Sequence, residues 1–412
     1  MALANVLSTL VPKIIAGRSL EFLRENAVMP RLVNNISDKV VGKKGDVITL
    51  PDSAALTVAD VTVGATPPLP ANSSITAKYV TLNKWRKVSF GIDDRDITQI
   101  LDTEHFVPVQ MQEAMQALGN DVDSYILGLV HNGTGAYNHV GVAGTTPFAT
   151  NLAVFAEARA LLNKDLCPTA NRKVVLDPDA EANAMILDIF MQADQRGDQG
   201  GVIKGEIGHK LGCDFYLNQN VPTHTAGTWA IKGTGYCVFS AIATAGTSTF
   251  IIKGLSATHT SGGSILAGDV FYVTGDSQPY VVKANASCTA ATADSTLALT
   301  CSPPFRVTIA ADATVTWSGI TPVLVGGVGG PADSVENIMF HPNAFAFCSR
   351  PMVTQSSYLG STGHFAATVR DPLTGIGMRM EVIREYKQWL IDFDILYGCT
   401  LVRPEMVCRI LG

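Results

Sequence analysis

Charged residues are scarce in this sequence, and their scarcity excludes several classes of protein. Lys, Arg, Asp and Glu make up 16% of the 412 residues, and the net charge is −6. A protein that coats nucleic acid needs clustered Lys and Arg to neutralise phosphates. The densest basic stretch here is "GKKGD" at Gly42–Asp46, which is typical of a turn. With 47% hydrophobic residues and 37 glycines, the composition instead predicts a globular chain that buries surface against partners.

Long apolar runs and a secretion signal are also missing. No window reaches the roughly 18 uninterrupted apolar residues expected of a membrane-spanning helix. The first residues, Met1–Leu23, are apolar but have no basic leading region, and Pro12 and Lys13 interrupt them. We therefore interpret them as a helix or arm of the mature protein, with no membrane partner.

The cysteines do not have the spacing of a metal or redox site. No two of them form a C-x-x-C pair, which argues against a zinc ribbon and a thioredoxin-type motif. We expect buried free thiols in a reducing cytoplasm. The eight cysteines are Cys167, Cys213, Cys237, Cys288, Cys301, Cys348, Cys399 and Cys408.

The sequence also contains few groups of residues with the spacing of a catalytic or metal-binding site. The histidines are scattered singly, without Glu-x-x-His or His-x-x-x-His spacing, so we predict no metal site. They are His105, His131, His139, His209, His224, His259, His341 and His364. The glycine-rich "VGGVGGPA" at Val325–Ala332 lacks the Lys and following helix of a phosphate-binding loop, and no G-x-S-x-G elbow occurs. We therefore expect no catalytic residue, no cofactor and no enzymatic activity.

Two groups of carboxylates are the nearest candidates for a site. Asp93, Asp94 and Asp96 are spaced as a paired-carboxylate or metal site would be, but we interpret them as a solvated strand end and a helix cap. Asp392 and Asp394 lie on one side of a predicted strand, where we expect the solvent face.

The hydrophobic periodicity indicates a mixed α+β fold. Apolar residues recur every three or four positions in 104–130, which predicts a long helix with one buried face: Met111, Met115, Leu118, Val122, Ile126 and Leu129. Gln112, Glu113, Gln116, Asn120 and Asp123 are expected to face away. Shorter helices are predicted over about 152–162 and 180–193. Strands are predicted over 46–52, 76–92, 173–178, 337–342 and in the residues from 378 onward.

A stretch of low charge interrupts this pattern. Only nine of the 66 charged residues fall between Pro222 and Ser334, where strand-like alternation such as "DVFYVTG" is bounded by turn residues. A length above about 250 to 300 residues already favours more than one domain. We interpret 222–334 as a separately folding insert whose ends lie near each other.

Three passages carry a resemblance to a known family: "RKVVLDPDAEANAMI" (Arg172–Ile186), "GEIGHKLGCDFYLNQNVPTHTAG" (Gly205–Gly227) and "FDILYGCTLVRPEMVCRIL" (Phe393–Leu411). Together with the order of elements, they resemble the major capsid proteins of tailed bacteriophages with the Hong Kong ninety-seven shell fold. The most similar group is the coat-protein family of short-tailed phages, which carries an inserted domain. The resemblance spans the whole chain.

The resemblance implies a division of the chain and a β-barrel for the insert. The implied parts are an N-terminal arm (1–40), an E-loop (41–91), a P-domain with a long spine helix (92–150), an A-domain (151–221), the inserted β-barrel (222–334), and the second part of the A-domain with P-domain return strands (335–412). Barrel closure would remove exposed strand edges. For the E-loop we expect Val80 and Leu82 to be buried only between subunits, so that a charge there would weaken assembly more than monomer stability.

The implied function is self-assembly into an icosahedral shell enclosing phage DNA, in a virion assembled in the host cytoplasm. The implied partners are copies of the chain in hexamers and pentamers, a scaffolding protein, a portal, double-stranded DNA without sequence readout, and a decoration protein. An encapsulin-like nanocompartment has the same fold and is the alternative. The insert could also bind glycans, for which the available aromatic residues are Trp229, Tyr236, Phe271, Tyr272, Tyr280 and Trp317.

Overall fold

The computed structural model describes most of the chain. The described residues are 23, 27–36, 47–53, 75–94, 103–131, 136–191, 207–227, 237–255, 263–276, 278–288, 295–317, 333–352 and 364–412. They divide into two compact units, 1–119 with 345–402, and 120–344 with 403–412. In these residues no helix is both long and apolar enough to cross a membrane.

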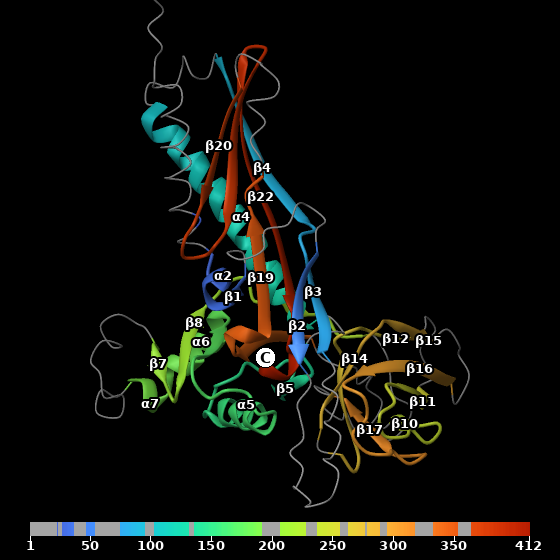
Figure 1. The fold of residues 1–412 in the computed structure, drawn as a ribbon. Helices are drawn as coiled ribbons and strands as arrows, with labels where there is room; N and C mark the ends of the chain where they lie inside the picture. The colour runs from blue at the N-terminus through green and yellow to red at the C-terminus, as the bar shows by residue number, and fades with distance from the viewer. Residues whose placement is uncertain are drawn as a thin grey trace, which may run out of the picture. The chain divides into compact units, whose positions relative to one another are not determined.

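The first unit is built on a six-stranded sheet. Its strands are β1 (Asn34–Asn35), β19 (Phe345–Arg350), β22 (Gln388–Leu401), β21 (Gly377–Glu385) and β20 (His364–Arg370), with β4 (Lys84–Asp93) also paired to β22. Figure 1 shows β4 and β22 running side by side, and their pairing extends from Gln388↔Asp93 to Tyr397↔Lys84. Ile391 and Phe393 are buried on either side of half-buried Asp392, and from Phe393 to Cys399 both faces of β22 are buried. The strands predicted in this part of the chain are confirmed.

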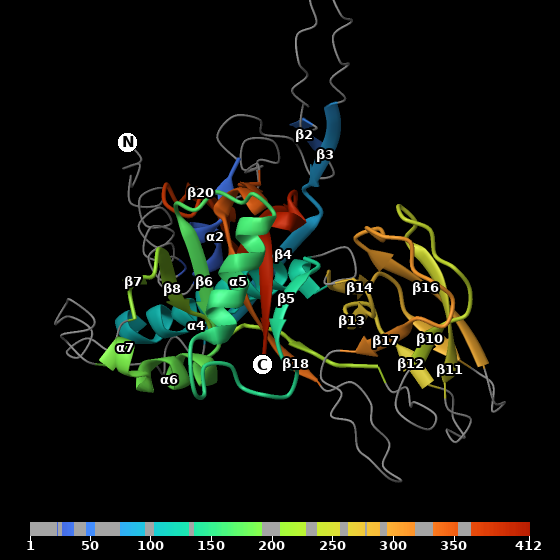
Figure 2. The ribbon, with the colours of Figure 1, turned by 90° about the horizontal axis from the view of Figure 1, so that it is seen from below.

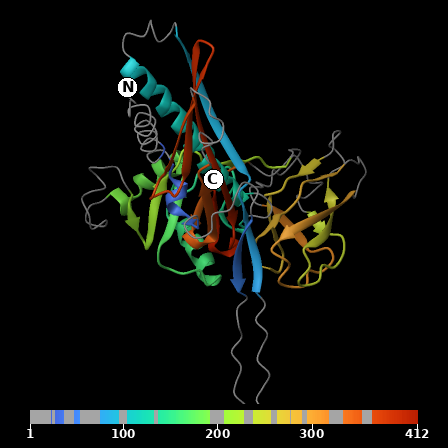
Figure 3. The same ribbon diagram turned by 45° about the horizontal axis from the view of Figure 1, so that its top comes forward.

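A two-stranded hairpin belongs to the same unit. Strand β2 (Val47–Ser53) pairs with β3 (Ile75–Thr81) in antiparallel register, from Val47↔Thr81 to Ser53↔Ile75. Figure 3 shows the two strands, in blue, side by side. The predicted strand 76–92 is broken at Leu82–Asn83, after which β4 joins the larger sheet. A short helix, α2 (Met29–Leu32), precedes β1.

The long helix is confirmed as α4 (Thr103–His131). On its predicted face, Met111, Met115, Leu118, Val122 and Ile126 are buried and Leu129 is half-buried. One position differs from the prediction, because Asp123 is fully buried and accepts a hydrogen bond of 2.7 Å from Asn218 Nδ2. A buried carboxylate needs such a partner.

The second unit contains a seven-stranded sheet. Its order is β5 (Asn138–Gly141), β23 (Val407–Leu411), β18 (Ser334–Phe340), β6 (Arg172–Leu176), β8 (Cys213–Leu217) and β7 (His209–Lys210), with β9 (Thr223–His224) also paired to β18. Helix α5 (Ala153–Lys164) packs against β5 and β23. The helix predicted over 180–193 consists of α6 (Pro178–Ile186) and α7 (Asp188–Met191), because Leu187 between them adopts an extended backbone. Asp177 caps α6 by accepting from the backbone N–H groups of Asp179 and Ala180.

The predicted barrel is present as a closed sheet of six strands. They are β10 (Cys237–Phe239), β11 (Thr249–Leu255), β16 (Ser295–Ser302), β14 (Tyr280–Val282), β13 (Val270–Val273) and β17 (Thr314–Trp317). Figure 2 shows them gathered in yellow and orange. A small sheet of β12 (Gly263–Ile265) and β15 (Ala286–Cys288), both labelled in Figure 1, belongs to the same stretch of chain. The turn predicted at Gly268–Asp269 is present and leads into β13. Within this turn, Asp269 N–H donates to Leu266 O at 3.2 Å. The fold is therefore α+β with an inserted closed barrel.

The barrel has a core of its own. Sixteen buried residues form one cluster inside it, among them Phe239, Phe250, Phe271, Tyr280 and Trp317. Phe250 lies 5.1 Å from Phe239 and 5.1 Å from Phe271, measured between ring centroids. Aromatic pairs at these distances add to the free energy gained by burial.

The thiols that the structure describes follow the prediction. Six cysteines are free and buried: Cys167, Cys213, Cys301, Cys348, Cys399 and Cys408. Burial raises the pKa of each of these six thiols, so they stay protonated and unreactive at neutral pH.

Candidate assembly surface

One face of the β2–β3 hairpin belongs to the core of the first unit. Ile48 and Val80 are cross-strand partners, and they pack with Leu82, Ala346, Cys348 and Leu396 in one buried cluster. Val80 is 1% exposed and Leu82 is fully buried within the single chain. The expectation that these two residues are buried only between subunits is therefore wrong, since strands β19 and β22 of the same chain cover them.

The opposite face of the hairpin is exposed and uncharged. Tyr79 is 55% exposed and Val47 is 51% exposed, and Thr49, the partner of Tyr79, is also exposed. Pro51 extends this row of exposed residues along β2. Strands at a surface normally carry polar or charged side chains outward, so a bare apolar row indicates an interaction surface. We name Val47, Thr49, Pro51 and Tyr79 the hairpin face.

The base of the hairpin is held closely against β22. A side chain on Gly398 would lie 2.1 Å from Thr81 O, so only glycine fits where the two backbones meet. Thr400 Oγ1 donates to Tyr79 O at 3.1 Å. The hairpin face is therefore presented by a fixed backbone, although an isolated two-stranded ribbon is marginally stable.

Of the two carboxylates singled out in β22, Asp394 is engaged in an ion pair. Asp394 is buried, contrary to the predicted solvent face, and it accepts from Arg379 Nη2 at 2.6 Å and from Trp85 Nε1 at 2.9 Å. Asp394 raises the pKa of Arg379 despite the opposing effect of burial. The side chain of Asp392, two residues earlier, is half-buried.

The other acidic group also lacks the geometry of a site. Asp93 is exposed, as predicted for a strand end, and Asp94 forms a bidentate pair with Arg384, whose hydrogen bonds lower the pKa of Asp94. Asp96 lies outside the described residues, as does "VGGVGGPA" at 325–332. Over the ranges that the structure describes, no three His, Cys, Asp or Glu residues are grouped as metal ligands.

The described histidines have separate structural surroundings. His209 is exposed and contacts Asp214 at 2.6 Å, whereas His224 is buried against Asp269 at 2.9 Å. His341 is buried, and its Nδ1 accepts from Asn343 N–H at 3.2 Å. The side chains of His105, His131, His259 and His364 lie outside the described residues.

His139 should make stability depend on pH. Burial, together with the charge of Arg409, lowers its pKa from 6.5 to about 3. Below pH 6.5 the unfolded chain binds a proton that the folded chain does not, so stability falls as the pH falls from about 6.5 toward 3. At pH 5 the expected loss is ~2 kcal/mol.

This loss can be measured by denaturant unfolding at pH 7 and pH 5. His139→Gln should show a smaller difference between the two pH values than the wild type. His209→Gln, which changes an exposed histidine, should retain the wild-type difference. Equal differences in all three proteins would contradict the assignment to His139.

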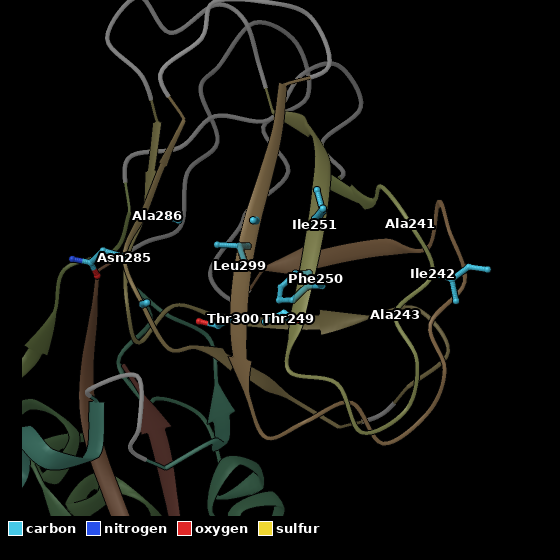
Figure 4. Close-up of a pocket in the computed structure, with 12 residues that line it drawn as sticks. Ala241, Ile242, Ala243, Thr249, Phe250, Ile251, Asn285, Ala286, Leu299 and Thr300 are labelled. Carbon is cyan, nitrogen blue, oxygen red and sulfur yellow. The ribbon is translucent and has the colours of Figure 1, made fainter.

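The barrel offers no described aromatic platform for a sugar. Phe271, Tyr280 and Trp317 are buried in its core, and half-buried Tyr272 lies 5.1 Å from the ring of His139. Trp229 and Tyr236 lie outside the residues whose side chains are described. A pocket of about 480 Å³ on the barrel is lined mainly by aliphatic side chains, and Figure 4 shows Ile242 pointing away from the barrel. The glycan-binding alternative stays a prediction, since two of its six candidate aromatic side chains lie outside the described residues.

One family model matches part of the chain. Residues 75–253 match the family model described as phage capsid protein. The match covers less than half of the chain. The matched residues include β3, β4, α4, barrel strand β10 and the first part of β11, so the family match and the resemblance in sequence agree. No curated protein matches the sequence.

Several solved structures are similar to this chain. A structure from Mycobacterium phage Che8 has 15% identity and a TM-score of 0.48, covering 93% of this chain and 90% of the other. The capsid of cyanophage P-SCSP1u has 10% identity and a TM-score of 0.45, covering 93% and 87%. A virus-like particle from Pyrococcus furiosus has 7% identity and a TM-score of 0.40, covering 96% of each chain.

Proposed function

We propose that the chain is a major capsid protein, many copies of which form an icosahedral shell around phage DNA. The family match over residues 75–253 carries this proposal. Pentamers and hexamers of the chain would build the shell, and each contact can be weak because every subunit makes many of them. The chain would act without catalysis, and a scaffolding protein, a portal and a decoration protein would be its further partners.

Within this function, the hairpin face would contact a second copy of the chain. The face is apolar, uncharged and about half exposed, and the neighbouring core fixes the backbone that carries it. The contact would place the predicted E-loop, 41–91, at an interface between subunits. We also propose that the chain has a P-domain and an A-domain with the boundaries predicted from the sequence.

Electron microscopy of the purified chain, expressed with and without its scaffolding protein, tests this function. We expect closed shells or capsomers, and shells recovered from infected cells should protect double-stranded DNA from nuclease. A strictly monomeric chain under both conditions would overturn the proposal. Shells that enclose an enzyme and no DNA would favour the encapsulin-like alternative.

A further inference from the structure

A buried polar seam joins the barrel to the seven-stranded sheet of the second unit. We use the name seam for Arg409, Glu336 and His224 of the sheet strands with Gly268 and Asp269 of the turn before barrel strand β13. Arg409 is 0% exposed and Glu336 is 1% exposed, and Arg409 Nη1 donates to Glu336 Oε1 at 2.7 Å. Two opposite charges at this depth require close pairing, because neither is solvated by water.

The same guanidinium reaches the insert. Arg409 Nη1 and Nη2 both point to Gly268 O, at 3.4 and 3.5 Å. Gly268 lies in the turn before β13 with φ +105°, and its N–H donates to Val282 O at 2.9 Å. Arg409 thus connects a strand of the sheet with a turn that is itself hydrogen-bonded into the barrel wall.

A second polar contact lies one residue further along the insert. Asp269 Oδ1 accepts from His224 Nε2 at 2.9 Å, and Asp269 Oδ2 accepts from Leu266 N–H at 2.8 Å. His224 is in β9, whose partner in β18 is Ser334. The contact therefore forms where the chain leaves the sheet for the insert and returns from it.

Close packing accompanies these hydrogen bonds. A side chain on Gly227 would lie 2.1 Å from Ser264 O and 2.9 Å from Ile265 Cα. On the other side of Arg409, the ring of His139 in β5 contacts Tyr272 in β13. The barrel and the turn before β13 are thus contacted by β5, by β23, by β9 and by the segment after β9.

We propose that Arg409 is a positioning residue, which fixes the orientation of the barrel on the sheet through Gly268. A barrel joined only by two chain segments would rotate about them. Donors on a rigid, planar guanidinium restrict that rotation, because their hydrogen bonds hold in few orientations. In a shell, the barrel would then be presented at one fixed angle by every copy.

The test uses the full-length unassembled chain with spin labels introduced by orthogonal chemistry at Ile242 of the barrel and Ile186 of α6, both exposed. Wild type should give one narrow distance distribution. Arg409→Met should give a broad distance distribution in place of the narrow one. Arg409→Lys should give a distribution of intermediate width, because lysine retains the positive charge but not the planar guanidinium with its several donors. Labels at Val142 and Ile186, both outside the barrel, should keep their distribution in all variants.

A double variant separates positioning from stability. Arg409→Met with Glu336→Met removes both buried charges, and such apolar replacements often leave stability unchanged or raise it. We expect its unfolding midpoint to recover relative to Arg409→Met, while its barrel distance stays broad. A narrow barrel distribution in both variants would overturn the proposal. A broad distribution for Val142 and Ile186 would also overturn it, since Arg409 would then only stabilise the sheet.

Discussion

Tyr79→Glu should abolish shell assembly while leaving the stability of the unassembled chain within ~0.5 kcal/mol of wild type. Tyr79 is 55% exposed on the hairpin face, so the folded monomer solvates the new charge. In a shell the same carboxylate would be buried between subunits without a partner, which is unfavourable. Because every subunit repeats the contact, a small penalty at each one removes closed shells.

The adjacent residue supplies the matched comparison. Val80→Glu makes the same substitution on the opposite side of β3, where Val80 packs with Ile48, Leu82 and Leu396. Burial of an unpaired charge there should destabilise the monomer by more than about 4 kcal/mol. Thermal unfolding of the unassembled chains should therefore separate two variants that differ by one position.

Sedimentation and electron microscopy of the same preparations complete the experiment. Tyr79→Phe, which keeps the ring and adds no charge, should assemble as wild type does. If Tyr79→Glu also assembles normally, the hairpin face is not an interface. If it lowers the unfolding temperature as much as Val80→Glu does, the face belongs to an intramolecular core.

The hairpin illustrates what a single sequence can predict. The alternation in 76–82 separates Val80 and Leu82 from Tyr79 and Thr81, and the structure retains this separation. It does not indicate which surface covers the apolar side, because Cys348 and Leu396 lie more than 250 residues later in the chain. Local periodicity therefore predicted the strand but gave the wrong partner for its buried face.

Buried polar residues were missed for the same reason. Asp123 interrupts no helical pattern, and its partner Asn218 is brought to it only by the tertiary fold. Arg409 stands in the apolar run "VCRIL", where one charge is typical of a solvent-facing position. It is buried because β23 is a central strand and because the insert reaches the guanidinium through Gly268. The long helix, by contrast, follows from local periodicity and was predicted correctly, whereas the closed barrel was expected from the family resemblance.

The insert is expected to fold when residues 222–334 are expressed without the rest of the chain. Its six strands form a closed barrel around sixteen buried residues, so its main core needs no residue of the host. Strands β9 and β18 place His224 opposite Ser334, and the two ends of the segment therefore lie close together. We expect a single cooperative thermal transition and dispersed amide signals. Replacing the insert in the full chain by a short Gly-Ser linker should leave soluble chains that assemble poorly.

Two neighbouring residues of β11 test whether the barrel core provides this stability. Phe250 is buried among Phe239, Phe271 and Phe305, whereas Ile251 points outward and is partly exposed. Phe250→Ala should cost the isolated insert ~3–5 kcal/mol, a large share of the 5–15 kcal/mol typical of a domain. Ile251→Ala should cost far less, because the outward side chain leaves no cavity. Two outcomes would contradict this expectation: an isolated insert that is unfolded, or equal losses of unfolding free energy from both substitutions. Either would mean that the host sheet holds the barrel together. The seam at Arg409 would then be part of one continuous core.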